Sequence, residues 1–533
     1  MEKTVFVRRT SGLVRPYGAF DTTLIYTLVI FSILNTTVQF PWFWGFWPGA
    51  DIVGSLAFAL IPQGLLAVCY WAIACAMPRS GSDYVWFARI THPALGFAWG
   101  LVYWYWFVAV CVLSTAFTYG YVISVTFFAW GTLYNAPNLV NLGNWLNGTN
   151  GSFIFAVVIM LIYSGITILG HKAGKILLYT AWAIQIVALI LMWTILGSWT
   201  TPTIFASKWD TLMSTYTTYQ GVFALAKGAG WVMSPFSIAA TIGSASYTIF
   251  LLAGATQGAG TISGEIRNVN RSIPLALGLA NVFAFFIWAL SAMAELHATG
   301  QQWIVALSWL WDNQPSKFPL TLPPSMPLML GIATYPNQFL TFAALSTFCL
   351  ANIAFVYVLL MCCSRYFFAW AFDRVMPTKL ADVNARFKTP HWAIIATMAV
   401  LFVSAIGFAY TGFSNWFGAG ATLMVVLFGL VACTVAIFPF TKWVTLLDQL
   451  PTFMRKRVGI PIISWVGLIT ALIMFYSAYA VTINPLMTSN LNLTVYWAVG
   501  FGAAGIVIYY ISKWYNKRQG IDISLIFKEV PPT

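Results

Sequence analysis

The residues best suited to bind a ligand lie in Leu251–Glu265, a glycine-rich stretch that ends a long uncharged apolar run. Gly254, Gly258 and Gly260 fall where a membrane helix would be strongest, and each costs a helix interior about 1 kcal/mol relative to alanine. The pattern predicts a broken helix whose freed peptide N–H and C=O groups can hold a small polar molecule at the membrane midplane. The alternative is that these glycines let two unbroken helices pack closely.

The composition is that of an integral membrane protein. Of its 533 residues, 60% are hydrophobic and 7% are charged, whereas soluble domains have about 25% charged residues. Apolar runs long enough to cross a hydrocarbon core of about 30 Å predict twelve membrane helices. They begin near Asp21, Ile52, Ala94, Ser152, Ile176, Phe236, Ile273, Phe339, Trp392, Trp416, Ile460 and Thr494.

The positive charges indicate how these helices are oriented. Of the 26 Lys and Arg residues, all except Lys208, Lys227 and Lys317 fall on the side of the two termini. Because such an excess marks the cytoplasmic side, we expect both termini in the cytoplasm and the chain in the cell membrane. The net charge of +13 then requires no nucleic-acid partner, and the lipid bilayer is the expected surrounding. The long segment Glu295–Gln338 is expected to fold over the outer mouth.

The sequence offers little to an enzyme or a metal centre. The four histidines are scattered over loops on both sides, without an H-E-x-x-H motif or paired carboxylates inside the membrane. The seven cysteines lie in apolar runs without a C-x-x-C pair, as small buried hydrophobic residues do. We therefore expect no catalytic residue, no metal and no cofactor.

A second polar interruption occurs in the first predicted helix, where Asn35, Thr36 and Thr37 stand in mid-run. The glycine-rich run is in the sixth helix, five helices further along the chain. Since five is odd, a second five-helix unit would enter the membrane from the opposite side, which is the geometry of an inverted repeat with two broken helices in matching places. The alternative is that these side chains hydrogen-bond their own helix or a neighbour.

Three cytoplasmic stretches carry a family resemblance. They follow helices 2, 6 and 8 in this order. The first reads Met77-Pro-Arg-Ser-Gly-Ser-Asp-Tyr, and the second reads Glu265-Ile-Arg-Asn-Val-Asn-Arg-Ser-Ile-Pro. The third reads Asp373-Arg-Val-Met-Pro and is followed by Arg386-Phe-Lys-Thr-Pro. Together they resemble the loops of amino acid permeases in the amino acid–polyamine–organocation (APC) superfamily. The resemblance implies an all-α membrane protein of twelve helices with a LeuT-type 5+5 inverted repeat and broken helices 1 and 6.

The resemblance also implies where a substrate binds. Exposed backbone of helices 1 and 6 would hold the carboxylate and ammonium of an amino acid, using the partial charges of half-helix ends. The corresponding residues are Asn35, Thr36 and Thr37 in helix 1 and Ala253, Gly254, Ala255, Thr256 and Gln257 in helix 6. Helix 1 lacks the glycine motif usual in the family, and Ala253 and Thr256 replace aromatic residues. The substrate, which could also be a related small amine, is therefore left open.

The coupling ion is left open between H⁺ and Na⁺. Some relatives place a lysine in helix 5, at a position that corresponds to Gln185, and a neutral amide cannot replace that charge. Ser346 and Thr347 in helix 8 offer hydroxyl oxygens where related folds ligate sodium, although two hydroxyls in a membrane helix can also serve packing alone.

Acidic residues on the basic cytoplasmic face suggest a gate. Asp83 and Glu265 can pair with Arg79, Arg89 or Arg267 when that face is closed and separate when it opens. The alternative is ordinary surface ion pairing worth less than about 1 kcal/mol.

These expectations combine into one reading: a secondary active transporter of amino acids or related amines that works by alternating access. Its predicted parts are a cytoplasmic segment (residues 1–20), a first repeat with helices 1–5 (21–200), a second repeat with helices 6–10 and external loops (201–445), helices 11–12 (446–515) and a cytoplasmic tail (516–533). The alternatives are a transporter-derived sensor, a transporter of another substrate class and, least favoured, a membrane enzyme.

Overall fold

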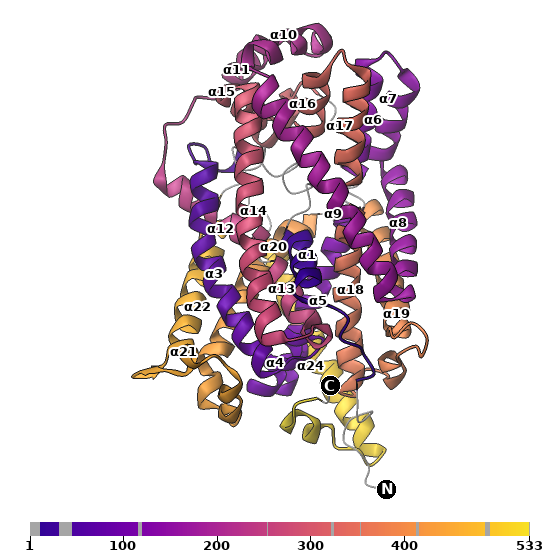
Figure 1. Cartoon of the computed structure of the whole chain (residues 1–533), viewed down its shortest axis with the longest axis vertical. Coiled ribbons are helices and arrows are strands. Elements are labelled where there is room, and N and C mark those ends of the chain that lie inside the picture. Colours follow the sequence, from indigo (N-terminus) through magenta and orange to yellow (C-terminus); the bar gives the residue numbers. More distant parts are fainter. Residues whose placement is uncertain are drawn as a thin grey trace.

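The computed structural model describes residues 11–30, 45–115, 120–252, 254–320, 324–351, 353–411, 415–484 and 491–531. This described part contains ten helices that are long and apolar enough to cross a membrane, and they run side by side along the long axis of the molecule (Figure 1). They are α3 (Ile52–Ala76), α5 (Pro93–Leu113), α8 (Thr149–Leu169), α9 (His171–Thr194) with the π-helix η2 (Ile195–Trp199), α14 (Val269–Thr299), α17 (Gln338–Leu350) with α18 (Ile353–Phe372), α19 (His391–Tyr410), α20 (Asn415–Ile437) with η6 (Phe438–Phe440), α22 (Ile462–Thr482) and α24 (Leu491–Arg518). The chain is therefore a multi-pass membrane protein.

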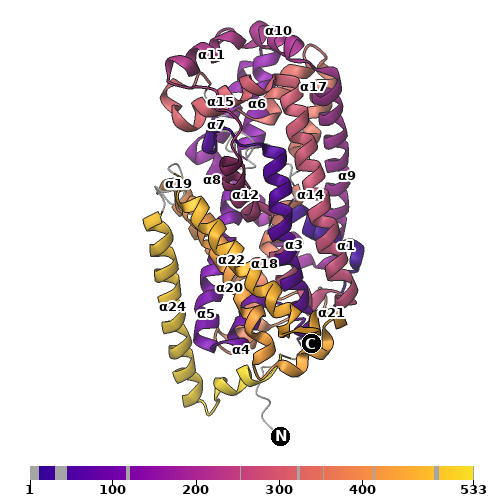
Figure 2. The ribbon, with the colours of Figure 1, turned by 90° about the vertical axis from the view of Figure 1, so that its left-hand side faces the viewer.

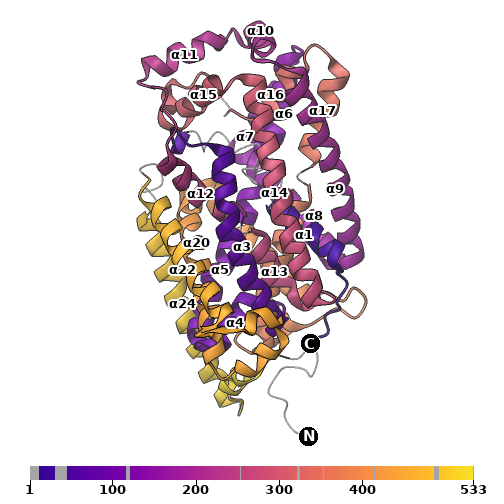
Figure 3. The same ribbon diagram turned by 60° about the vertical axis from the view of Figure 1, so that its left-hand side comes forward.

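The two remaining expected spans, 1 and 6, are represented by shorter helices. These are α1 (Ala19–Ile30), α12 (Ile238–Leu252) and α13 (Gly254–Ile262). The expected irregularity in helix 1, with Asn35, Thr36 and Thr37, lies outside the described residues, as does Ala253 between α12 and α13. Both breaks remain predictions. In the described part, α1 packs against α13 and α14, and α12 packs against α3 (Figure 3).

One end of the molecule, here called the cap end, is covered by helices from the long loops (Figures 1 and 2). They are α6 (Gly120–Leu133), α7 (Pro137–Asn147), α10 (Pro202–Met213), α11 (Tyr219–Gly228), α15 (Gln301–Asn313), η4 (Pro315–Lys317) and α16 (Met326–Thr334). Lys208 Nζ donates to the carbonyl oxygen of Ala333 at 2.6 Å, and the rings of Tyr219 and Trp303 stack with centroids 5.1 Å apart. These contacts join α10, α11, α15 and α16 into a packed layer.

The opposite end, the terminal end, holds the shorter elements. They are α4 (Ser82–Ile90), η3 (Ser263–Glu265), η5 (Thr378–Ala381), η7 (Val444–Gln449), α21 (Thr452–Arg455), the antiparallel strands β1 (Arg457–Val458) and β2 (Ile460–Pro461), and η8 (Ile523–Lys528). Ser11 and Pro531, the first and last described residues, line one small pocket there. Both ends of the described chain therefore lie on the same side of the molecule.

Local sequence signals explain the way α4 is placed. Gly81 precedes it with φ 80°, a left-handed conformation that glycine adopts without strain. Pro93 starts α5 directly after α4, as proline does at the first turn of a helix. Gly96 then lets the two helices meet, because a Cβ on it would lie 2.3 Å from the Cα of Ala88. Two glycines and a proline thus hold α4 tightly across the terminal end.

Candidate functional site

The centre of the candidate site is a contact between α3 and α13. Gln63 Nε2 donates to Thr256 Oγ1 at 3.1 Å, and both side chains are fully buried. Gly254, Ala255 and Gln257 belong to the same helix α13. Thr256 therefore lies where the predicted substrate segment meets a polar partner. Sequence reasoning missed Gln63, although a Pro-Gln pair inside an otherwise apolar helix is a usable signal because a proline removes one helical hydrogen bond.

Gln185 lies in the interior, as the argument for a cation position requires. It is buried on α9, a helix that packs against α1 and α17. One turn earlier on α9, Trp182 Nε1 donates to the carbonyl oxygen of Leu24 on α1 at 3.2 Å. The helix that carries Gln185 therefore packs against α1 and against α17, which carries Ser346 and Thr347, and whether an ion binds there remains a prediction.

Ser346 and Thr347 are half-buried on α17, and both donate to carbonyl oxygens of their own helix. Ser346 Oγ bonds Phe342 O at 2.6 Å, and Thr347 Oγ1 bonds Ala343 O at 2.6 Å. These bonds use the hydroxyl protons and leave oxygen lone pairs for other partners. The geometry is compatible with sodium ligation by these hydroxyls and also with a role in packing alone.

At the terminal end, Glu265 forms a buried ion pair. Arg365 Nε and Nη2 donate to its two carboxylate oxygens at 2.8 and 2.9 Å, and both side chains are about 95% buried. The expected partners were Arg79, Arg89 or Arg267. The partner is instead Arg365 of α18, brought to Glu265 by the packing of the helices, while Arg267 is exposed and donates to the carbonyl oxygen of Pro16 at 3.1 Å.

A second buried pair joins Arg89 of α4 to Asp373, which directly follows α18. Arg89 Nη2 and Nη1 donate to the two Asp373 oxygens at 2.9 and 3.1 Å, and Tyr84 OH donates to the same carboxylate at 2.9 Å. Arg89 does not pair with Asp83, because six helical residues place them about 120° apart around the axis of α4. Both pairs are therefore bidentate: one joins η3 to α18, and the other joins α4 to the residue that follows α18.

Asp83 has no arginine partner among the described residues. Its carboxyl group is 1% exposed, Tyr366 OH donates to Oδ2 at 3.3 Å, and no described group donates to Oδ1. Burial raises the pKa of this carboxyl to about 7, and the hydroxyls of Tyr70, Tyr366 and Tyr103 offset part of that rise. The residue is thus a buried acid surrounded by tyrosines rather than one half of a salt bridge.

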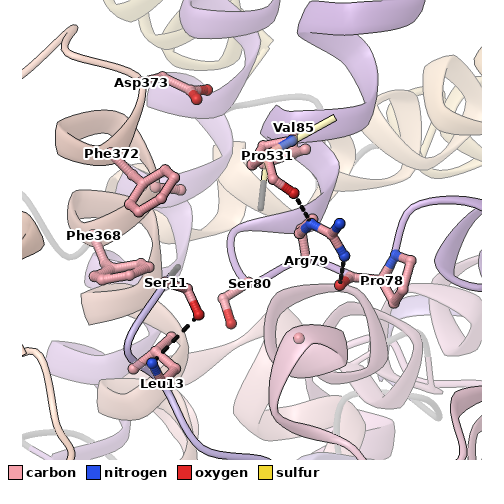
Figure 4. Close-up of a pocket in the computed structure, with 12 residues that line it drawn as sticks. Ser11, Leu13, Pro78, Arg79, Ser80, Val85, Phe368, Phe372, Asp373 and Pro531 are labelled. Atoms are coloured by element: carbon pink, nitrogen blue, oxygen red, sulfur yellow. Dashed lines mark hydrogen bonds between the residues drawn. The ribbon is translucent and has the colours of Figure 1, made fainter. Parts of the chain in front are cut away.

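The C-terminal tail, residues 521–531, closes over α4. Figure 4 shows Arg79 between Pro531 and Pro78, and its guanidinium donates to both carbonyl oxygens. Arg89 Nε donates to the carbonyl oxygen of Glu529 at 3.0 Å. Partial burial and the positive charges of Arg15 and Arg89 lower the pKa of Arg79 to about 10.

Apolar side chains of the tail anchor these polar contacts. Ile523, Ile526 and Phe527 are at least 97% buried, and the Arg89 guanidinium lies 5.3 Å from the centre of the Phe527 ring. The cavity left between the tail, the loop before α4 and the end of α18 has a volume of only about 30 Å³. The terminal end is therefore closed in this structure.

The cap end is more open. A cavity of about 320 Å³ lies between the start of α3, the segment before α12, the end of α14 and α15. Its walls include Asp51, Trp231, Phe236, Leu296, Gln301 and Trp309. Within the described residues, no group of three or more His, Cys, Asp or Glu side chains could hold a metal ion, and the seven cysteines are free.

Comparison with known proteins agrees with the fold and the loop motifs. No curated protein sequence matches the chain. A family model described as amino acid permease matches residues 18–504, which include every membrane helix up to the middle of α24. The chain therefore belongs to the amino acid permease family of the APC superfamily, and it is a membrane transporter for amino acids rather than an enzyme.

Proposed function

We propose that this permease is a secondary active transporter that moves amino acids or related small amines by alternating access. The observation that supports this most directly is the difference between its two ends. Two buried arginine–carboxylate pairs and the tail close the terminal end, while the cap end keeps a cavity of about 320 Å³. Opening one end while closing the other requires contacts of this kind, which can be made and broken as units.

The proposed architecture is the twelve-helix LeuT-type 5+5 inverted repeat. Its first repeat (residues 21–200) would begin with α1 and its second (201–445) with α12 and α13, and helices 11–12 (446–515) would follow. The contact of α1 with α13 supports the pairing of the two first helices at the centre. Segments 1–20 and 516–533 would flank the helices in the cytoplasm, which makes the terminal end the cytoplasmic side of the cell membrane.

The substrate would bind between α1 and α13. With helix 6 broken at Ala253 as predicted, the N–H groups of Gly254, Ala255 and Thr256 would be free to bind a carboxylate, and carbonyl groups at the end of α12 would be free to bind an ammonium group. Ala253, Gln257 and the helix 1 residues Asn35, Thr36 and Thr37 complete the proposed site. The bond from Gln63 would hold Thr256 in place.

Uptake into liposomes tests this proposal. The purified protein would be reconstituted and offered labelled amino acids and amines, while sodium and proton gradients are imposed separately. We expect saturable uptake of at least one amino acid that exceeds equilibrium only when one gradient is present. Thr256→Val, which removes the oxygen bonded to Gln63, should lower that uptake, and Thr482→Val, at the distant end of α22, should not. Uptake that never exceeds equilibrium under any gradient would refute secondary active transport.

A further inference from the structure

The least expected group at the terminal end is the Asp83 carboxyl. It lies on α4, where Tyr366 OH donates to its Oδ2 at 3.3 Å and no described group donates to its Oδ1. A carboxylate buried without a cation is strongly unfavourable, and such groups are found protonated instead. The geometry therefore favours the neutral acid as long as α4 is packed in place.

Among the described residues, the side chains that act on this carboxyl are hydroxyls rather than cations. The titratable groups that face it are Tyr70 of α3, Tyr103 of α5, and Tyr366 and Cys362 of α18. Among them the Tyr70 and Tyr103 hydroxyl oxygens lie 3.4 Å apart. In the described chain, α13 and α20, which also pack on α4, carry no Asp, Glu, His, Lys or Arg.

The nearby charges are already compensated. Arg89 is bound to Asp373, and Arg365 is bound to Glu265. In η8, which also contacts α4, Lys528 is exposed to solvent. Each of these two arginines is thus neutralised by a carboxylate other than Asp83, which leaves protonation as the way to remove the charge of Asp83.

We propose that Asp83 is a binding site for one cytoplasmic proton, which is taken up when the terminal end closes and released when it opens. The step is a simple transfer: the proton leaves water on that side, forms the O–H bond of the Asp83 carboxylic acid, and returns to the same water when α4 separates from its neighbours. This inference rests on the proposed function, because it assigns the ligand to a closing step of the transport cycle. It makes the cytoplasmic pH a determinant of which end is open.

The size of the effect follows from linkage. In the closed state the pKa of the Asp83 carboxyl is about 7, whereas the pKa of a hydrated aspartate is about 4. Because the closed-state value is the raised one, protonation stabilises the closed end fully below about pH 4, and this advantage is lost as the pH rises through about 7. Between pH 6 and pH 8 the ratio of closed to open molecules should fall about tenfold.

Hydrogen–deuterium exchange of the segment Met77–Ile90 measures this ratio in the full-length protein in lipid nanodiscs. After correction for the intrinsic pH dependence of exchange, we expect its protection to fall about tenfold from pH 6 to pH 8, while the segment Ile462–Thr482 changes little. Asp83→Asn should remove the dependence. Tyr366→Phe should shift the midpoint to higher pH, because the Tyr366 hydroxyl lowers the pKa of Asp83.

Tyr105→Phe is the control, because this tyrosine lies on α5 next to the tyrosines that face Asp83 but stacks on Phe501, with ring centroids 4.1 Å apart, and it should leave the midpoint unchanged. A tenfold dependence that persists in Asp83→Asn would overturn the proposal. If Asp83→Asn does not fold, an unchanged midpoint in Tyr366→Phe overturns it. The same preparation, assayed for uptake, separates the two proposals: pH-dependent protection without any uptake would count against transport alone, and normal uptake with pH-independent protection would count against the proton site alone.

Discussion

Neutralising Asp373 should open the terminal end. In Asp373→Asn the Arg89 guanidinium, whose side chain is fully buried in the closed structure, loses its counter-charge. Removing one partner of a buried ion pair costs about 3–5 kcal/mol, because the other charge stays buried without compensation. If α4 moves and water reaches Arg89, that cost falls on the closed state only. The ratio of closed to open molecules should then drop by roughly 150- to 4,000-fold.

The assay is the exchange protection of Met77–Ile90, compared between the wild type and Asp373→Asn at one pH. A matched control is Arg455→Met, which breaks the exposed pair of Arg455 with Asp448, whose side chains are 36% and 84% exposed. Exposed pairs contribute less than about 1 kcal/mol, so this control should change the protection little.

A double variant separates the charge effect from general damage. Arg89→Met combined with Asp373→Leu removes both charges, and replacing both members of a buried pair by apolar groups of similar size is often close to neutral. We expect the double variant to recover most of the lost protection. The closed state should remain less stable than in the wild type by about 1–2 kcal/mol, because the Tyr84 hydroxyl and the Glu529 carbonyl lose their hydrogen-bond partner. Full protection in Asp373→Asn, or a double variant that is less protected than the single one, would refute the reasoning.

Three further outcomes are expected. Deleting residues 521–533 uncovers Arg79 and should lower the exchange protection of the loop before α4 in an otherwise folded protein. Gln185→Lys should leave a folded protein with altered uptake, and replacing sodium by choline should change wild-type uptake little, whereas a steep sodium dependence would contradict this choice. Gly96→Ala should lower the free energy of unfolding by roughly 1–3 kcal/mol, because the new Cβ would lie 2.3 Å from Ala88 Cα. Gly165→Ala should not lower it, because a Cβ there meets nothing within 4 Å.

The membrane helices were predictable because hydropathy adds up over about twenty residues. Runs predicted to begin near Ile52, Ala94 and Ser152 correspond to α3, α5 and α8, which start at Ile52, Pro93 and Thr149. Errors in single residues average out over such lengths, so these positions agree to within a few residues.

The partners at the terminal end were not predictable in the same way. Arg89 and Asp373 are 284 residues apart in the chain, and only the packed helices bring them together. Asp83 was expected to join a salt bridge because it is close to arginines in sequence, yet the geometry of α4 puts it on a different face of the helix from Arg89. Burial decides the state of such a group, and burial is a property of the assembled fold.

The tail was predicted, but its packing against α4 was not, for a related reason. Its three buried apolar residues, Ile523, Ile526 and Phe527, follow an i, i+3, i+4 spacing over a segment too short to indicate an amphipathic helix. This spacing is the one feature of the sequence that indicates a buried face on the tail.

The position of the tail also sets an order of events during synthesis. Residues 521–531 follow every membrane helix in the chain, so they leave the ribosome after α24 has been made. Until then, Arg79 and Arg89 have no carbonyl acceptors from Pro531 and Glu529. These contacts of the tail therefore form only once α24 and the helices before it have been translated, and a chain truncated just after Arg518 would keep the described membrane helices but lose the contacts of the tail with Arg79 and Arg89.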